Sequence, residues 1–248
     1  MSVPDDIALF ILVGFVAQMV DGALGMAYGV TSTTFLIGFG VPPAVASASV
    51  HTAEVVTTGV SGLSHWRFGN VDGPLMRRLV IPGVIGSVLG AYILTQAPVA
   101  LIKPVVSAYL VVMGIVILAK AVSRVSDRPV RTKLVPLGLA GGFLDAMGGG
   151  GWGPIVTSTL IARGNTPRYT IGSVNMAEFF VTVASSVTFV LTIGLSHWRA
   201  ILGLMVGGVI AAPFGAYVCR LLPARFIMFM VGVLVTFLSL RTLVQTLF

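Results

Sequence analysis

The sequence predicts an all-α integral membrane protein built from two homologous repeats. Three observations lead to this fold class. The composition is that of a chain embedded in lipid, an internal repeat recurs at an offset of about 124 residues, and each repeat begins with an apolar stretch that glycines interrupt. In each repeat we expect a glycine-broken helix pair, either re-entrant or discontinuous, followed by three membrane-spanning helices.

The composition excludes a soluble protein. Hydrophobic residues make up 56% of the chain and charged residues 9%, and the mean hydropathy is +1.01, whereas a soluble domain has roughly 25% charged residues. We expect one membrane domain and, from the acidic first residues, no cleaved signal peptide. The single cysteine, Cys219, excludes an internal disulfide. The net charge of +7 comes from loops, where it suits topology and anionic lipid better than nucleic acid.

The first repeat opens with two short apolar runs, Ile7–Val20 and Gly25–Gly38. Each has about 14 residues, which is roughly 21 Å of helix, while the hydrocarbon core needs about 20 residues. We therefore expect that neither run spans the bilayer alone. The pair is either a re-entrant hairpin or the two pieces of one broken helix.

Three longer helices follow, one from Pro42 or Pro43 to about Ser64 and two at Pro74–Thr95 and Pro98–Ala121, with a polar turn at His65–Asp72. A basic segment then separates the repeats. We divide the chain into a first transmembrane repeat (residues 1–122), a basic cytoplasmic linker (123–133) and a second transmembrane repeat (134–248).

The internal repeat is visible without gaps. Shifting residues 21–61 by 124 positions gives 14 identities in 41, which include Asp21/Asp145, Pro43/Pro167 and Glu54/Glu178. Apolar composition alone would match Leu and Val but not Asp, Glu and Pro at one offset. The sequence therefore predicts a duplication, as in transporters built from internal repeats.

Loop charge favours inverted repeats. If the linker is cytoplasmic and the broken pair is re-entrant, 12 of the 15 Lys and Arg residues face the cytoplasm, and Lys103, Arg199 and Arg241 lie outside. If the pair is one broken spanning helix, the repeats are parallel and the split is 10 to 5. We expect inverted repeats with both termini outside.

Glycine breaks are the candidate solute sites. Gly138–Pro154 reads GLAGGFLDAMGGGGWGP, and four consecutive glycines favour an unwound backbone. Within a bilayer, such backbone survives only against protein or a water-filled cavity. Helix starts after a break would offer free N–H groups to an anion. The alternative is a glycine seam for close helix packing. The candidate binding residues are Gly148, Gly149, Gly150, Gly151 and Trp152, with Gly25, Met26, Ala27 and Tyr28 as their weaker copy.

Four acidic residues lie in or beside apolar segments and form two repeat-related pairs: Asp21 with Asp145, and Glu54 with Glu178. Such groups cost at least about 2.5–3.5 kcal/mol to insert and are usually functional. We assign all four to proton coupling. For the two Asp residues, a structural role as caps on the following helix start is an equal alternative. The two Glu residues lie halfway along long helices, where there is no cap to make.

His51 and Asn175 precede these glutamates by three residues, so each shares a helix face with its Glu. We expect both to bind the solute, and His51 is also able to relay protons. The hydroxyls on the same helices either bind the solute or bond to the preceding turn; they are Ser47, Ser49, Thr52, Thr57, Thr58, Ser61, Ser173, Thr182, Ser185 and Ser186.

No pattern in the sequence indicates an enzyme or a bound group. His51, His65 and His197 are the only histidines, so we expect no metal site. A Ser–His–Asp arrangement is lacking, and the glycine run is not followed by the GK[ST] of a Walker loop. We expect no catalytic residues and no cofactor.

Two glycine-broken entries, each followed by a proline-started polar helix, resemble the sulfite exporter TauE/SafE family of membrane permeases. The motifs are GGGGWGP at Gly148–Pro154 and the turn Gly69–Asp72. The first repeat has fewer glycines, and Val30 stands in place of the proline. The resemblance implies transport of small sulfur-containing anions, such as sulfite, sulfonates or sulfoacetate-like compounds, or of related organic anions.

The function we predict is a proton-coupled secondary transporter for such an anion, with alternating access by rocking one repeat against the other. The alternatives are an anion channel, a membrane-embedded enzyme and a purely structural subunit. We expect a multi-pass protein of the inner cell membrane. Its partners would be lipid and a small anionic solute, with no nucleic acid, and a homo-oligomer is compatible with the sequence.

Overall fold

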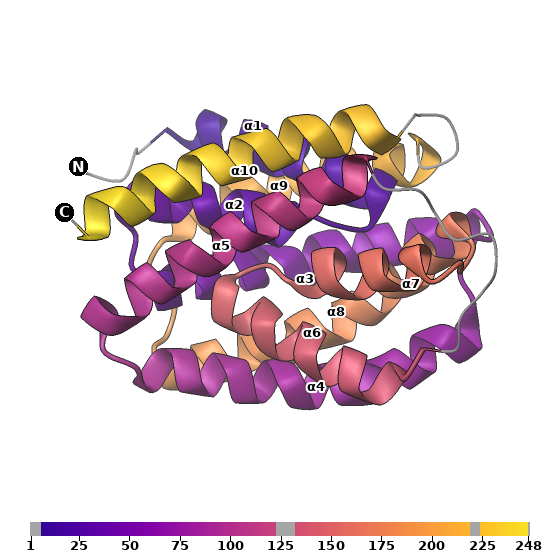
Figure 1. Cartoon of the computed structure of the whole chain (residues 1–248), viewed down its shortest axis with the longest axis horizontal. Helices are drawn as coiled ribbons and strands as arrows, with labels where there is room; N and C mark the ends of the chain where they lie inside the picture. The colour runs from indigo at the N-terminus through magenta and orange to yellow at the C-terminus, as the bar shows by residue number, and fades with distance from the viewer. Residues whose placement is uncertain (1–5, 123–131, 219–223, 248) are drawn as a thin grey trace.

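The computed structural model describes residues 6–122, 132–218 and 224–247, and these contain helices and no strand (Figure 1). The predicted linker lies largely outside the described residues. The elements, in order, are α1 (Ile7–Leu24), α2 (Tyr28–Gly38), α3 (Pro43–Arg67), α4 (Gly73–Gln96), α5 (Val99–Val122), α6 (Leu134–Gly148), the π-helical turn η1 (Gly153–Thr157), α7 (Ser158–Ala162), α8 (Pro167–Thr192), α9 (Trp198–Val218) and α10 (Ala224–Leu247).

Five of these helices, α1, α4, α5, α8 and α9, are long and apolar enough to cross a membrane. Prolines at the first turns of α3, α4 and α8 fit the helix start, because a missing N–H costs nothing there. The chain is therefore an all-α, multi-pass membrane protein, as the composition predicted.

Helix α1 corrects one expectation. It continues past Val20 to Leu24 and has 18 residues, so it is long enough to span alone. It ends only at Gly25, which adopts a left-handed conformation (φ 66°) and donates its N–H to the Asp21 carbonyl oxygen at 2.5 Å. Likewise α3 runs through His65 to Arg67, so the predicted polar turn begins three residues later than expected.

Helix α2 folds back along α1. Residues from both helices line one cavity of ≈ 320 Å³, among them Leu12 and Val16 of α1 and Thr31 and Phe35 of α2. In a continuous helix, Leu12 and Phe35 would lie about 34 Å apart at 1.5 Å per residue. Helix α2 therefore does not continue α1 as the second piece of one broken helix, and the two form a helix hairpin.

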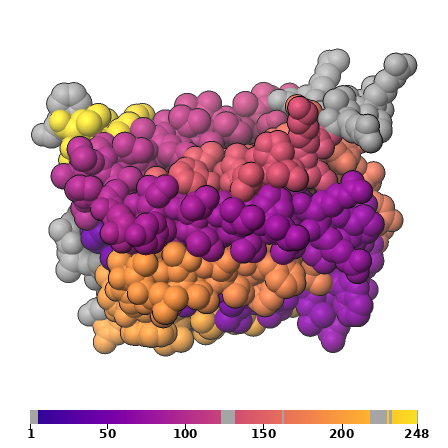
Figure 2. Space-filling view, turned by 90° about the horizontal axis from the view of Figure 1, so that it is seen from below, coloured from indigo at the N-terminus to yellow at the C-terminus, as the bar shows by residue number. Residues whose placement is uncertain are grey.

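Most close helix pairs join the part of the chain before the linker to the part after it. Helix α1 packs on α9, α4 on α6, α5 on α10 and α3 on α8, and there are further contacts between α4 and α8 and between α3 and α9. Figure 1 shows α4 beside α6 and α5 beside α10, and Figure 2 shows α4 between α6 and α8 on one face. The two parts are interwoven.

Helices α3 and α8 cross in opposite directions. The Thr58 and Thr182 hydroxyls are 3.3 Å apart, while Ser61, one turn later on α3, donates to the Asn175 side-chain oxygen, two turns earlier on α8 (2.8 Å). Antiparallel packing of these two helices places the central residues of both next to each other.

Candidate functional site

The predicted break in the second half is present. Helix α6 ends at Gly148, Gly149 is left-handed (φ 66°), and Gly150 and Gly151 are not helical. The N–H groups of Gly149 and Gly150 donate to the Asp145 carbonyl oxygen, the latter at 3.0 Å. Three of the four glycines, residues 149–151, thus lie in an unwound segment, where the sequence predicted one.

The Asp145 side chain closes this break. Its Oδ1 accepts hydrogen bonds from the backbone N–H of Gly151 (2.8 Å) and of Trp152 (3.0 Å). The cap interpretation is therefore confirmed for Asp145. We predicted that the N–H groups after the break would bind a solute. In the structure they donate instead to the carboxyl group of Asp145.

His51 connects Asp145 to α3. Its Nε2 lies 3.1 Å from Asp145 Oδ2, and its Nδ1 lies 2.9 Å from the Ser47 carbonyl oxygen. The Ser47 hydroxyl donates to the Ala146 carbonyl oxygen (2.7 Å), so its hydrogen is not available to His51. Nδ1 is therefore a donor, and the His51–Asp145 contact shares one proton between Nε2 and Oδ2.

The break in the first half is as long as that in the second, with residues 25–27 outside a helix, and Asp21 interacts with the Tyr28 backbone N–H as Asp145 does with that of Trp152. Gly25 is left-handed, and Ala27 (φ 91°) is the single non-glycine residue with positive φ in the described part of the chain. A positive φ is uncommon for residues other than glycine and marks a constrained backbone. Asp21, the counterpart of Asp145, has an Oδ2 with no hydrogen-bond partner.

The aromatic residues of the breaks point into the protein. The Tyr28 hydroxyl donates to the Leu204 carbonyl oxygen (3.1 Å), and the Trp152 indole N–H donates to the Val174 carbonyl oxygen (3.2 Å). Their exposed fractions are 1% and 0%. Each aromatic side chain therefore fixes the start of its helix against a neighbouring helix.

The two breaks contact each other directly. The Thr33 hydroxyl donates to the Gly149 carbonyl oxygen (2.7 Å), and the Thr157 hydroxyl donates to the Gly25 carbonyl oxygen (2.7 Å). A Cβ added at Gly29 would lie 2.6 Å from the Gly149 carbonyl oxygen, so backbone meets backbone. Neither threonine was among the predicted site residues, although Thr33/Thr157 is one of the identities at the offset of 124.

The four predicted acids form one buried cluster. Asp21, Glu54, Asp145 and Glu178 lie on α1, α3, α6 and α8, with exposed fractions between 1% and 4%. Each carboxyl group interacts electrostatically with the other three. Glu54 Oε2 and Glu178 Oε2, like Asp21 Oδ2, have no hydrogen-bond partner. The arrangement brings together acids that are separated by up to 157 residues.

Asn175 and the hydroxyls have mixed roles. The Asn175 Oδ1 accepts from Ser61, and its Nδ2 donates to the Ile171 carbonyl oxygen (3.2 Å). Ser47, Thr58 and Ser61 reach other helices, whereas Ser186 has no partner. Hydroxyls that bond to the preceding turn of their own helix, as the backbonding alternative predicted, are those of Ser49, Thr52, Thr57, Thr58, Ser173, Thr182 and Ser185.

Tyr109 was also missed. From α5 its hydroxyl donates to the Gly150 carbonyl oxygen at 3.1 Å, and its ring packs against Gly148. No signal in the sequence distinguishes it from other aromatic residues of an apolar helix. His65, expected in the polar turn after the first long helix, is fully buried, with Nε2 3.1 Å from the Gly22 carbonyl oxygen.

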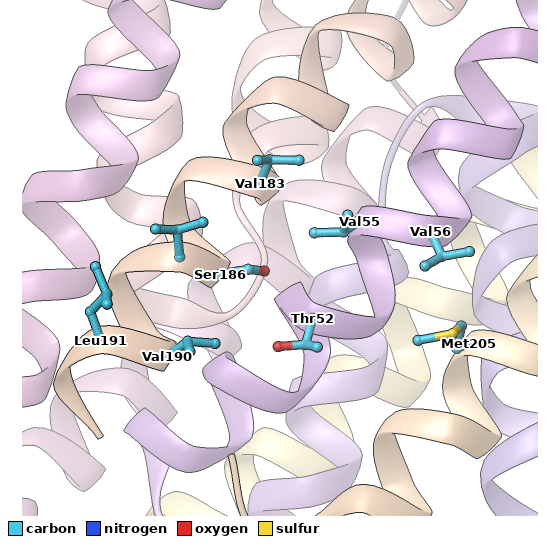
Figure 3. Close-up of a pocket in the computed structure, with 9 residues that line it drawn as sticks. Thr52, Val55, Val56, Val183, Ser186, Val190, Leu191 and Met205 are labelled. Carbon is cyan, nitrogen blue, oxygen red and sulfur yellow. The ribbon is translucent and has the colours of Figure 1, made fainter. Parts of the chain in front are cut away.

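A lateral cavity of ≈ 400 Å³ lies apart from this cluster, between α3, α8 and α9 (Figure 3). Its walls are apolar except for the hydroxyls of Thr52 and Ser186, and neither the break residues nor the four acids line it. The lining residues are Thr52, Val55, Val56, Val183, Ser186, Val187, Val190, Leu191 and Met205. In the described residues, no three His, Cys, Asp or Glu side chains are placed to hold a metal ion.

Comparison with known proteins agrees with this picture. A family model described as Sulfite exporter TauE/SafE matches residues 10–242. The chain is 42% identical over 247 residues to a protein named "Probable membrane transporter protein YtnM" from Bacillus subtilis (strain 168), covering 96% of this chain and 82% of that protein. No solved structure matches.

Proposed function

This chain belongs to the sulfite exporter TauE/SafE family and is a membrane transporter, and we propose that it couples protons to the movement of a small sulfur-containing or organic anion. The single observation that supports this most is the buried cluster of four carboxyl groups beside two contacting glycine breaks. We assign the protein to the inner cell membrane.

The cluster explains why protons and an anion would move together. Carboxylates repel an approaching anion strongly in a medium of low dielectric constant. A proton bound by the cluster removes that repulsion, so each ligand raises the affinity for the other, and this linkage is reciprocal. Protons would bind at Asp21 Oδ2, Glu54 Oε2 and Glu178 Oε2, because these oxygens accept no hydrogen bond that a proton would have to displace.

The anion would bind where Asp145 now lies. Protonated Asp145 no longer holds the Gly151 and Trp152 N–H groups as a carboxylate does, and an anionic oxygen then takes its place. His51 supplies or accepts the shared proton, and Asn175 lies one turn from Glu178 on α8. The remaining break residues, Gly25–Tyr28 and Gly148–Gly150, shape the backbone around the solute.

We propose that residues 1–122 and 134–248 are inverted repeats. Support comes from the antiparallel crossing of the equivalent helices α3 and α8, and from helix pairs that recur with the halves exchanged, α1 on α9 and α6 on α4. Because each pair joins both halves, rocking one half against the other would break most close contacts. The moving units of alternating access would therefore contain helices from both repeats.

Flux measurements on purified protein in proteoliposomes test the proposal. Wild-type protein should move sulfite or a sulfonate saturably, and an imposed proton gradient should change the rate. Glu178→Gln should fold but lose the response to the proton gradient. Asp72→Asn is the matched control, because Asp72 caps α4 at the Leu75 N–H and an Asn fulfils that role. Unchanged proton-driven flux in Glu178→Gln would show that the cluster is not the coupling site.

A further inference from the structure

The carbonyl oxygens of Gly25 and Gly149 end two helices inside the protein. Each glycine is the C-cap of its helix, so its carbonyl oxygen has no partner within the helix. With no water in a bilayer core, such a group needs a donor from elsewhere in the protein. For each of them the donor is one threonine hydroxyl at 2.7 Å.

The two donors are exchanged between the halves. Thr33 of α2 donates to the break of the second half, and Thr157 of η1 donates to the break of the first half. Both threonines are fully buried. Close packing follows the same exchange: Gly29 lies against the Gly149 carbonyl oxygen, and a Cβ at Gly153 would lie 2.7 Å from Met26 Cβ.

We propose that Thr33 and Thr157 are positioning residues of the transporter, which lock the two glycine breaks into one unit. Each hydroxyl holds the break of the other half in its unwound conformation. Asp145, His51 and the other acids are then aligned relative to a fixed backbone. The breaks stay together through the transport cycle, and access alternates by movement of the helices around them.

Hydrogen exchange of the backbone amides tests this crossed dependence, with valine substitutions that keep the shape of threonine and remove its hydroxyl. Thr33→Val should speed exchange at residues 148–152, and Thr157→Val should speed it at residues 25–28. Loss of one hydrogen bond at a buried carbonyl corresponds to about 5- to 30-fold faster exchange through local opening. Thr33→Ser should restore the wild-type rates, because serine keeps the hydroxyl.

Thr52→Val is the matched control, because the Thr52 hydroxyl donates to Ala48 within its own helix at 2.7 Å. It should leave both breaks unchanged. Faster exchange confined to the neighbours of the substituted threonine, or a control that loosens the breaks equally, would overturn the proposal. If Thr33→Val does not fold, Thr157→Val alone tests the reverse direction.

This inference concerns the site of the proposed function but is measured without solute. Failure of the anion assignment would appear as absent flux with the crossed exchange pattern intact. If Thr33 and Thr157 do not hold the two breaks together, their substitution would not speed exchange at the break of the other half, whichever solute is transported.

Discussion

Replacing Gly149 with alanine should destabilise the protein more than the same change at another left-handed glycine. Alanine at φ 66° costs about 1–2 kcal/mol, because its Cβ crowds the backbone. At Gly149 the new Cβ would also lie 2.8 Å from Thr33 Cγ2 and closer still to its hydroxyl. Overpacking adds about 1–3 kcal/mol, and the displaced Thr33 leaves a buried carbonyl without a donor, for a further about 1–3 kcal/mol.

The control is Gly194→Ala. Gly194 has φ 69°, and a Cβ there meets nothing within 4 Å. Gly194→Ala therefore loses only the stability that the left-handed backbone costs an alanine. Gly149→Ala should lower the free energy of unfolding by about 2 kcal/mol or more beyond that. For a chain of this size that difference lowers the melting temperature by about 4–8 °C. Thermal unfolding of both variants in one detergent measures it. Equal melting temperatures would refute the packing of the two breaks against each other.

Two further predictions concern the seam between α3 and α6 or α8. Asp145→Asn should fold, because an Asn oxygen still accepts from the break and its amide faces His51 Nε2, but flux should lose its dependence on the proton gradient; a retained dependence would contradict the shared proton. Thr58→Cys with Thr182→Cys, in a Cys219→Ser background, should form a disulfide across hydroxyl positions 3.3 Å apart and stop flux until it is reduced; undiminished flux in the oxidised protein would show that α3 and α8 do not separate.

The fold was predictable where local chemistry decides it. Prolines marked the starts of α3 and α8, and the glycine run marked the unwound segment. The end of α1 was not predictable, because Gly22 does not interrupt the helix. It lies within α1, where a Cβ would be 3.0 Å from Gly215 Cα on α9. A packing glycine and an unwinding glycine look alike in sequence, and only the partner helix distinguishes them.

The candidate site was predictable in its residues but not in its contacts. A carboxyl group in an apolar segment is conspicuous wherever it lies, so Glu54 and Glu178 were found from their flanks. The contact between His51 and Asp145 joins residues 94 positions apart on different helices, and no periodicity encodes it. The role of Thr33 was not predictable from the sequence, because the hydroxyl of a threonine in an apolar helix ordinarily bonds to the preceding turn of its own helix.

Proton movement driven by an anion gradient is the most direct test of proton coupling by the buried carboxyl groups. Proteoliposomes holding a pH-sensitive dye receive an inward gradient of an alkanesulfonate, an anion that stays ionised near neutral pH, with no initial pH difference. We expect a change of internal pH that saturates with the sulfonate concentration and is absent with Glu178→Gln. Saturable sulfonate movement with constant internal pH would contradict proton coupling by the buried carboxyl cluster.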